Sequence, residues 1–422
     1  MFDINLIRED PKLVKENLKK KFQQDKTAIV DALIEKDKKW KELKQKSDEL
    51  RAERNKISLA INELKKQGKN AAKEIKKASE LPEEIRKTDE ELQQEEQQIK
   101  TMLLELPNIM HPSVPIGKDE SENKVIKTWG KPKKNLFELK SHGELIEERD
   151  QGDFGSSTKI AGAGFYYLKD KIAWLNQALI RYAVDYLRKK GYTYVEPPLM
   201  MRKAPYEGVV DLADFQNVMY KIENEDLYLI ATSEHPLISQ YMNMTIPEDK
   251  LPIKLTGYSM CFRKEIGSHG VDTRGLFRTH QFNKVEQVII CKPEDSWKYF
   301  DELLSNTEEL FKGLEIPYHL LEICSGDLGK IKAKQIDLEI WMAKQQQYRE
   351  ATSLSNCTDY QARRLGIKII DKNGNKRYAH TLNDTAIATS RALVGIIENF
   401  QQKDRTILIP KALHKYTGFK KI

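Results

Sequence analysis

The sequence predicts an α+β protein in which an N-terminal antiparallel helical hairpin, a coiled coil, precedes a domain built on an antiparallel β-sheet flanked by helices. From about residue 27 to 104, glycine is nearly absent and apolar residues recur at the spacing of a coiled coil. After a proline-rich segment, glycine and aromatic residues return, and short β-type runs alternate with helices without regular βαβ order. We therefore expect an N-terminal domain over 1–104, a connector over 105–118 and a main domain over 119–422.

Two apolar seams predict the hairpin. The first falls largely on two heptad positions, and the second repeats every seven residues: Leu33, Trp40, Leu43, Leu50, Ile57, Ile61 and Leu64, then Ala71, Ala78, Ile85, Leu92 and Ile99. Gly68 and Asn70 are turn residues between the two helical limbs. Each limb should be roughly 50 Å long. Pro82 is expected to kink the second limb or to start a new helical segment.

The distal part of the hairpin is basic. Residues 51–77 contain three acidic residues and nine basic ones, which gives a net charge of +6. The basic residues are Arg51, Arg54, Lys56, Lys65, Lys66, Lys69, Lys73, Lys76 and Lys77. A basic tip on a long lever suits contact with nucleic-acid phosphates. A solvated coiled-coil face without a partner explains the charge equally well.

The bulk composition indicates a soluble, cytoplasmic protein. The 422 residues carry a net charge of +7, and 32% of them are charged. The four cysteines are not in metal-ligand spacing, so we expect reduced thiols, no zinc site and no disulfide framework. The N-terminus lacks the apolar core of a signal peptide, and no apolar run is long enough to cross a membrane.

The main domain is predicted to contain helices over 171–190, 294–314 and about 386–401. The β-type runs are 192–196, 227–231, 258–262, 285–291, 319–324, 337–341 and 350–354. Neither a GxGxxG nor a GxxxxGK[ST] motif occurs, which argues against Rossmann and P-loop nucleotide sites.

The densest group of chemically useful residues lies at 262–286 and reads as strand, glycine-rich loop, strand. Arg263 and Glu265 should share one strand face, as should Phe282 and Glu286, and Arg278 follows the loop. Guanidinium groups suit phosphate, and a phenyl ring suits a flat base. Such a cluster of charges would be costly without a charged ligand.

This block resembles motif 2 of class II aminoacyl-tRNA synthetases and, in detail, seryl-tRNA synthetases. Residues 191–199 resemble motif 1, the dimer-interface unit, and 382–401 resemble motif 3, a strand and a helix carrying Arg391. The resemblance covers essentially the whole chain. It implies a class II catalytic domain that activates L-serine with ATP and transfers the seryl group to tRNA(Ser), with tRNA(Sec) as an open second substrate. It also implies a homodimer in which tRNA reaches across subunits and contacts the nine basic hairpin residues.

The resemblance also implies roles in ATP binding. Arg263 would hold the α-phosphate, Arg278 the γ-phosphate and Glu265 the adenine amino group. Phe282 and Arg391 would sandwich the adenine, and the three arginines would carry catalysis. The other implied ATP contacts are Lys264 and the run Glu350, Ala351, Thr352 and Ser353, of which Glu350 and Ser353 would bind Mg²⁺. Without that context, the run is as well explained as an edge strand with polar faces.

Thr232, Ser233 and Glu234 match the family's serine-binding loop, usually Thr-Ala-Glu. The resemblance adds Arg263, Glu286, Asn383 and Thr385 to the serine site. A small pocket of carboxylates and hydroxyls grips an ammonium and a short hydroxyl chain, rejects alanine by leaving polar groups unpaired, and excludes threonine by size. Alone, Thr232–Glu234 is more often a helix N-cap.

Two departures concern this pocket: Ser233, and Asp384 in place of the family's common glycine. We expect little effect of Ser233, whereas Asp384 puts the fine pocket geometry in question. His269 and His280 lie in the motif 2 block, where a solvated loop histidine and a satisfied polar histidine are the expected roles. Nothing in the sequence suggests a general base.

Three other functions compete with this interpretation. A related enzyme that loads a small amino acid onto a carrier protein generally lacks the long arm. A catalytically inactive RNA-binding protein would not need the intact set Arg263, Glu265, Arg278, Glu286, Glu350 and Arg391. A coiled-coil scaffold explains residues 27–104 and nothing after them.

Overall fold

The computed structural model describes residues 1–210, 218–265 and 275–422 of the chain. The chain divides into two compact units, Met1–Pro107 and Asn108–Ile422, each described by itself below. Within the described ranges, no helix is long and apolar enough to cross a membrane.

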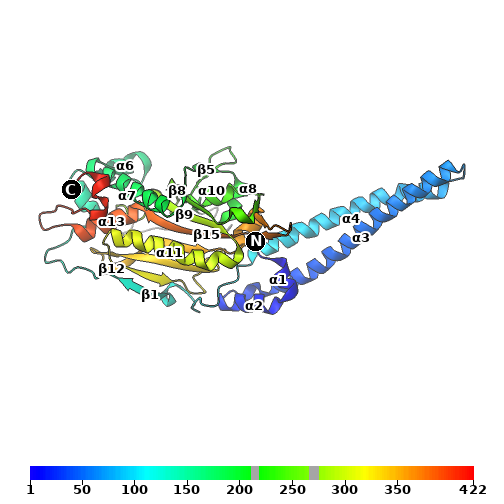
Figure 1. Ribbon diagram of the computed structural model, residues 1–422, viewed down its shortest axis with the longest axis horizontal. Coiled ribbons are helices and arrows are strands. Elements are labelled where there is room, and N and C mark those ends of the chain that lie inside the picture. Colours follow the sequence, from blue (N-terminus) through cyan, green and yellow to red (C-terminus); the bar gives the residue numbers. More distant parts are fainter. Residues whose placement is uncertain (211–217, 266–274) are drawn as a thin grey trace. The chain divides into compact units, whose positions relative to one another are not determined.

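The first unit is helical and contains the predicted hairpin (Figure 1). Its helices are α1 (Ile4–Glu9), α2 (Pro11–Lys20), α3 (Thr27–Lys66) and α4 (Ala72–Glu105). Helices α3 and α4 pack along each other, and Leu50 meets Leu81 and Ile85 in a small apolar cluster. Lys36 and Lys39 of α3 both pair with the buried carboxylate of Glu95 on α4.

Pro82 does not start a new helical segment, because α4 runs continuously from Ala72 to Glu105 with Pro82 inside it. That alternative of the prediction was wrong, and a kink at Pro82 stays a prediction. A proline removes one backbone donor and crowds the preceding turn. The flanking Leu81 and Ile85 are buried in the seam against α3, and this packing holds the helix together across the defect.

The nine basic residues of the hairpin are all exposed. Arg51 forms an ion pair of 2.7 Å with Asp89 of α4, and Arg54 donates to Asn55. The remaining seven lysines form no ion pair with any described residue of this chain, so their charges face solvent. The tip therefore keeps most of its positive charge exposed.

The second unit is built on an eight-stranded sheet with the order β1-β10-β11-β12-β15-β9-β8-β4. Neighbouring strands are antiparallel except β4 and β8. The strands are β1 (Lys124–Trp129), β4 (Thr193–Val195), β8 (Ile253–Phe262), β9 (Gln281–Cys291), β10 (Tyr318–Glu322), β11 (Lys334–Met342), β12 (Gln347–Asn356) and β15 (His380–Ala388). The α+β class and the antiparallel sheet predicted from sequence are confirmed.

Shorter strands form small sheets beside the main one: β2 (Gly152–Asp153) with β3 (Tyr167–Leu168), β5 (Met200–Met201) with β6 (Tyr228–Leu229), and β7 (Thr245–Pro247) with β13 (Lys368–Ile370) and β14 (Lys376–Tyr378). The further helices include α5 (His142–Glu148), α6 (Phe154–Ala161), α8 (Lys203–Val209), α10 (Glu234–Ser239), α12 (Tyr360–Leu365) and α14 (His414–Thr417).

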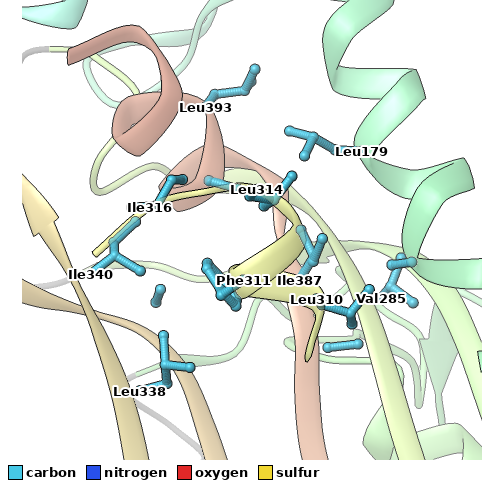
Figure 2. Packing of buried hydrophobic residues seen from close by; sticks show 14 of the residues in the cluster. Leu179, Val285, Leu310, Phe311, Leu314, Ile316, Leu338, Ile340, Ile387 and Leu393 are labelled. Atoms are coloured by element: carbon cyan, nitrogen blue, oxygen red, sulfur yellow. The ribbon is translucent and has the colours of Figure 1, made fainter. Parts of the chain in front are cut away.

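Three amphipathic helices cover one face of the main sheet and form the large core: α7 (Asp170–Lys189), α11 (Ser296–Gly313) and α13 (Thr389–Phe400). Figure 2 shows Leu310 and Phe311 of α11 among the strand residues of this core. Val285 and Ile289 of β9 belong to it. Because strand side chains alternate, Phe282, Lys284 and Glu286 point to the opposite face.

Most predicted elements appear within a few residues of their expected bounds. The closing helix begins at Thr389 instead of about 386, because β15 continues through Ala388. The run 227–231 supplies only the two-residue strand β6, and the edge strand β1 was not predicted. In β1 every residue except the last is exposed, so it lacks the apolar alternation that marks a half-buried strand.

Candidate active site

Two adjoining cavities open on the sheet face away from the core helices. The first is lined by residues of the motif 2 block, β12 and the β15–α13 junction. The second is lined by Thr232, Glu234 and His235 and by the segment 329–332, among others. Five residues line both cavities: Arg263, Lys284, Glu350, Ser353 and Thr385. Two ligands bound in these cavities would therefore meet beside Arg263.

Arg263 has hydrogen-bonding capacity left for an anion. Its Nε is buried and makes no hydrogen bond within the described residues, and its Nη2 makes only a long bond, 3.5 Å, to the Ala231 carbonyl. The guanidinium lies 5.2 Å from the centre of the Phe282 ring. Because Arg263 also lines both cavities, this donor is available to an anion bound there.

Arg391, near the start of α13, lies in the first cavity. Its guanidinium is 3.9 Å from the centre of the Phe277 ring, and it donates to the Glu350 carbonyl. Burial lowers the pKa of Arg391, and the charge of Glu350 opposes that shift. Phe277 also lines the cavity but was not predicted as a site residue. Its place beside Arg278 in the motif 2 block was the available signal.

Glu265 and Arg278 also line the first cavity, and they form an ion pair with each other. The strand predicted to carry Arg263 and Glu265 on one face ends at Phe262, and Glu265 has a positive φ of 47°. Because the strand ends before Arg263, the alternation of side chains along a strand does not apply to this pair, which explains the error.

Of the other residues predicted to bind ATP, Phe282 and the run Glu350–Ser353 line the first cavity. The run lies on β12, as predicted. Lys264 is not among the residues that line either cavity, and its backbone N–H donates to the Val218 carbonyl, 2.9 Å.

The second cavity gathers most of the residues predicted to bind serine. Glu234 accepts hydrogen bonds of 3.0 Å from both Gln361 Nε2 and Asn383 Nδ2. Burial and the nearby charge of Glu286 raise the pKa of Glu234 to about 7. Thr232 Oγ1 accepts a hydrogen bond of 3.2 Å from the backbone N–H of Glu234, the first residue of α10. The Thr232 side chain thus satisfies a donor at the helix start and also lines the cavity.

Ser233 lies behind the residues that line the second cavity. Its side chain is fully buried and donates to the Gly257 carbonyl, 3.0 Å. It does not line either cavity, so the hydroxyl that distinguishes Ser233 from the usual alanine faces away from the ligand space.

Lys284 was missed by the sequence prediction. Its Nζ lies 2.8 Å from Glu286 Oε2 and 3.1 Å from Thr232 Oγ1. Glu286 is buried and does not line a cavity itself, but it accepts from Thr385 Oγ1, 3.3 Å. The alternation along β9, which places residues 282, 284 and 286 on one face, could have found Lys284.

Asp384 faces away from the cavities. It neighbours Thr385 on β15, so its side chain points to the core side, where it accepts from Thr307 Oγ1 and Gln287 Nε2. Burial raises the pKa of Asp384 well above its usual value. This departure from the family's glycine therefore leaves the cavity lining unchanged.

Asp337 adds a carboxylate near Glu350 and Ser353. It lines the second cavity and lies opposite Ser353 in the β11–β12 pairing. Burial, and then the charge of Glu350, raises the pKa of Asp337. Two carboxylates that disfavour each other's ionisation are stabilised by a bound cation. The described residues contain no cluster of three or more His, Cys, Asp or Glu that could hold a metal ion without other ligands.

His280 supports the backbone beside Arg263. Its Nδ1 lies 2.8 Å from the Tyr220 hydroxyl and 2.9 Å from the Arg263 carbonyl oxygen. This is the satisfied polar histidine that was predicted. His269 belongs to residues 266–274, which lie outside the described part of the chain.

Comparisons with known proteins agree with this geometry. The profile of the class II tRNA synthetase core domain (G, H, P, S and T) matches residues 218–400. The profile of the seryl-tRNA synthetase N-terminal domain matches residues 1–110. A curated relative from Methanocella arvoryzae, named serine–tRNA ligase, is 50% identical over 99% of this chain and 98% of its own length.

Two solved structures are similar over the whole chain. The seryl-tRNA synthetase of Pyrococcus horikoshii, complexed with ATP, has a TM-score of 0.94 and 45% identity, covering 100% of this chain and 99% of its own. The cytoplasmic serine–tRNA ligase of Naegleria fowleri, in complex with AMP, has a TM-score of 0.89 and 35% identity, with 100% and 98% covered. This chain therefore belongs to the seryl-tRNA synthetases, the class II family of serine–tRNA ligases.

Proposed function

We propose that this protein activates L-serine with ATP and transfers the seryl group to the 3′ end of tRNA(Ser). The observation that carries the proposal is the position of Arg263, a half-buried arginine whose buried Nε has no partner in the described residues, where two cavities join. One cavity has the aromatic and cationic lining that suits a nucleotide. The other has the carboxylates and hydroxyls that suit a small amino acid.

In the first step, an oxygen of the serine carboxylate attacks the α-phosphorus of ATP. The bond from that phosphorus to the oxygen bridging to the β-phosphate breaks, and pyrophosphate leaves. Arg263 offsets the charge that builds up on the α-phosphate, while Arg278 and Arg391 hold the rest of the nucleotide. In the second step, a hydroxyl of the terminal adenosine of tRNA attacks the seryl carbonyl carbon, and AMP leaves. Catalysis comes from positioning and charge stabilisation, without a covalent enzyme intermediate.

In the amino-acid cavity, we assign the serine ammonium to the carboxylate of Glu234 and the serine hydroxyl to Thr232 and Thr385. Glu286 lies behind this lining, where its carboxylate holds Thr385 and adds negative charge beside the ammonium. The amide of Asn383 holds Glu234 in place. Alanine would leave these buried polar groups unpaired, which costs a site of this kind roughly 10⁴-fold in kcat/KM. Threonine must then be excluded by the size of its extra methyl group.

Mg²⁺ fits the carboxylate of Glu350, the hydroxyl of Ser353 and the neighbouring carboxylate of Asp337, which are oxygen donors of the type that this ion prefers. Bound there, the ion would neutralise phosphate charge. This assignment adds Asp337 to the two ligands predicted from sequence.

Serine-dependent exchange of pyrophosphate into ATP tests the first step. We expect exchange with serine and at most residual exchange with threonine, alanine or glycine, followed by charging of a tRNA(Ser) transcript. Exchange that prefers glycine or alanine would identify a carrier-loading relative, and no exchange with any amino acid would identify an inactive homologue. Charging of a tRNA(Sec) transcript, measured in the same assay, decides whether tRNA(Sec) is a second substrate.

The raised pKa of Glu234 predicts a pH dependence for serine. The free carboxyl is protonated below about pH 7, whereas the serine ammonium requires it ionised. The value of kcat/KM for serine should therefore rise between pH 6 and pH 8, with an apparent pKa near 7. Glu234→Gln should weaken serine binding and flatten this rise, while the KM for ATP stays within about twofold. A wild-type profile without any inflection in this range contradicts the assignment.

We further propose that the protein is a homodimer in the cytoplasm, with the hairpin binding tRNA across subunits. Supporting the dimer, large apolar side chains are exposed on α7 and near the motif 1 segment: Trp174, Leu199 and Met200. A dimer interface built from motif 1 would cover these side chains, and contiguous exposed apolar surface is the usual mark of such an interface. Sedimentation velocity gives the oligomeric state directly.

A further inference from the structure

Outside the two cavities, a buried histidine and glutamate connect the elements that carry the nucleotide-binding arginines. His142 is the first residue of α5 and Glu398 lies near the end of α13, and their side chains are almost fully buried. His142 Nδ1 lies 2.9 Å from Glu398 Oε1. On its other side, His142 Nε2 lies 3.0 Å from the backbone nitrogen of Leu276.

The partners fix how the imidazole is used. A backbone N–H can only donate, so Nε2 is the acceptor and carries no proton. The proton is therefore on Nδ1, where it is donated to the Glu398 carboxylate. A neutral histidine in this one tautomer satisfies both contacts.

Glu398 is itself held from several directions. Its Oε2 accepts from the Lys344 backbone N–H, 3.0 Å, and its Oε1 also receives the His142 backbone N–H, 3.4 Å. Glu398 follows Arg391 by two helical turns on α13, so the two side chains share a face of that helix. The histidine is thus anchored to the helix that carries Arg391.

The segment that His142 holds leads directly into the nucleotide cavity. A Cβ on Gly275 would lie 2.2 Å from His142 Nε2, so only glycine lets the ring come this close. Leu276 is fully buried, and Phe277 and Arg278 after it line the cavity. The Phe277 ring lies 3.9 Å from the Arg391 guanidinium and 4.2 Å from that of Arg349.

We propose that His142, oriented by Glu398, is a positioning residue for ATP, because it fixes the segment that places Phe277 against Arg391 and Arg278 at the phosphate end of the cavity. None of these residues is among the described residues that line the second cavity, the one assigned to serine. Loss of the His142 contact should therefore weaken the use of ATP and leave serine binding unchanged. The inference rests on the proposed function, since it assigns a role within the same nucleotide site.

Two amide substitutions separate the two bonds of His142. In His142→Gln, the longer side chain brings an oxygen near the position of Nε2, so it can accept from Leu276. In His142→Asn, the shorter chain brings its NH₂ near the position of Nδ1, so it keeps the bond to Glu398 but loses Leu276. Gly275→Ala should push the imidazole away and also strain the backbone, because Gly275 has a φ of +102°, so its loss should be at least that of His142→Asn.

We expect His142→Asn and Gly275→Ala to lower kcat/KM for ATP in pyrophosphate exchange roughly 10- to 100-fold. His142→Gln should recover most of that loss. The dissociation constant for serine alone, measured by calorimetry, should stay within about twofold in all three. His414→Asn is the control, because His414 lines neither cavity and its ring bonds to the Ile409 carbonyl beside α14, so this variant should behave as wild type.

Equal losses in His142→Gln and His142→Asn, with equal weakening of serine binding and equal drops in Tm, would show a merely structural role and overturn the inference. An unchanged kcat/KM in His142→Asn would also overturn it. If the wild type shows no serine-dependent exchange, the proposed function fails. ATP affinity measured by calorimetry on the same variants then decides the positioning role separately.

Discussion

Replacing Arg263 with alanine should lower kcat for serine-dependent pyrophosphate exchange by about 10³-fold, the cost of losing one preorganised donor at a developing negative charge. Arg263 lines both cavities, and its buried Nε has no other partner in the described residues. Its loss therefore removes the group that meets both substrates. The secondary structure and the serine-free Tm should change little, because the hydrogen bond from this guanidinium to the Ala231 carbonyl is long and therefore weak.

The matched variant is Arg263→Lys, which keeps the charge but not the fork of donors. It should recover part of the rate, because a lysine reaches phosphate as a point charge and cannot bridge two oxygens. Steady-state exchange and circular dichroism on the same preparations check both variants. Near-normal exchange by Arg263→Ala, in a folded protein, would refute the assignment of this residue to the α-phosphate.

Shortening the hairpin should abolish tRNA charging and spare adenylate formation. Lys39 of α3 and Glu95 of α4 form an ion pair of 2.7 Å, so the chain can be closed here. Removing residues 40–93 and joining Lys39 to Gln94 by a short glycine–serine linker deletes the exposed basic tip. It leaves the pairs of Lys36 and Lys39 with Glu95 in place. Charging should fall by at least about 10³-fold at physiological salt, since the phosphate contacts that supply most of the affinity are lost.

A milder variant tests whether charge alone is responsible. Lys65, Lys66 and Lys69 are exposed and make no ion pair with the described residues, so Lys65→Gln, Lys66→Gln and Lys69→Gln together should raise the KM for tRNA and reduce its salt dependence. Pyrophosphate exchange should remain at the wild-type rate in both variants. If the shortened protein still charges tRNA normally, the hairpin is not the element that binds it.

The sequence was a good guide wherever a local rule decided the outcome. The seven-residue spacing around Leu50 and Ile85 predicted the hairpin, because apolar residues at that spacing must pack against a partner helix. Pro82 shows the limit of such rules: its local cost is clear, but the burial of Leu81 and Ile85 beside it outweighs that cost. The exposed edge strand β1 carries no apolar pattern, so its pairing with β10 is visible only in the structure.

The site residues could be named from sequence because motif spacing places them, but their pairings could not. Strand alternation alone would have identified Lys284 between Phe282 and Glu286. In contrast, the ion pair of Arg278 with Glu265 and the stacking of Arg391 on Phe277 depend on how separate segments meet. The same holds for Asp384, whose side chain faces α11 and not the pocket, because one residue of register along β15 decides its side.

The most direct test of two joined cavities is the affinity of a non-hydrolysable seryl-adenylate analogue, seryl-sulfamoyl adenosine, measured by calorimetry beside serine, AMP and the alanyl analogue. The seryl analogue should bind at least about 10³-fold more tightly than serine or AMP alone, because one molecule fills both cavities across Arg263. The alanyl analogue should bind much more weakly than the seryl one. A seryl analogue that binds no better than AMP, or no better than its alanyl counterpart, would contradict the account.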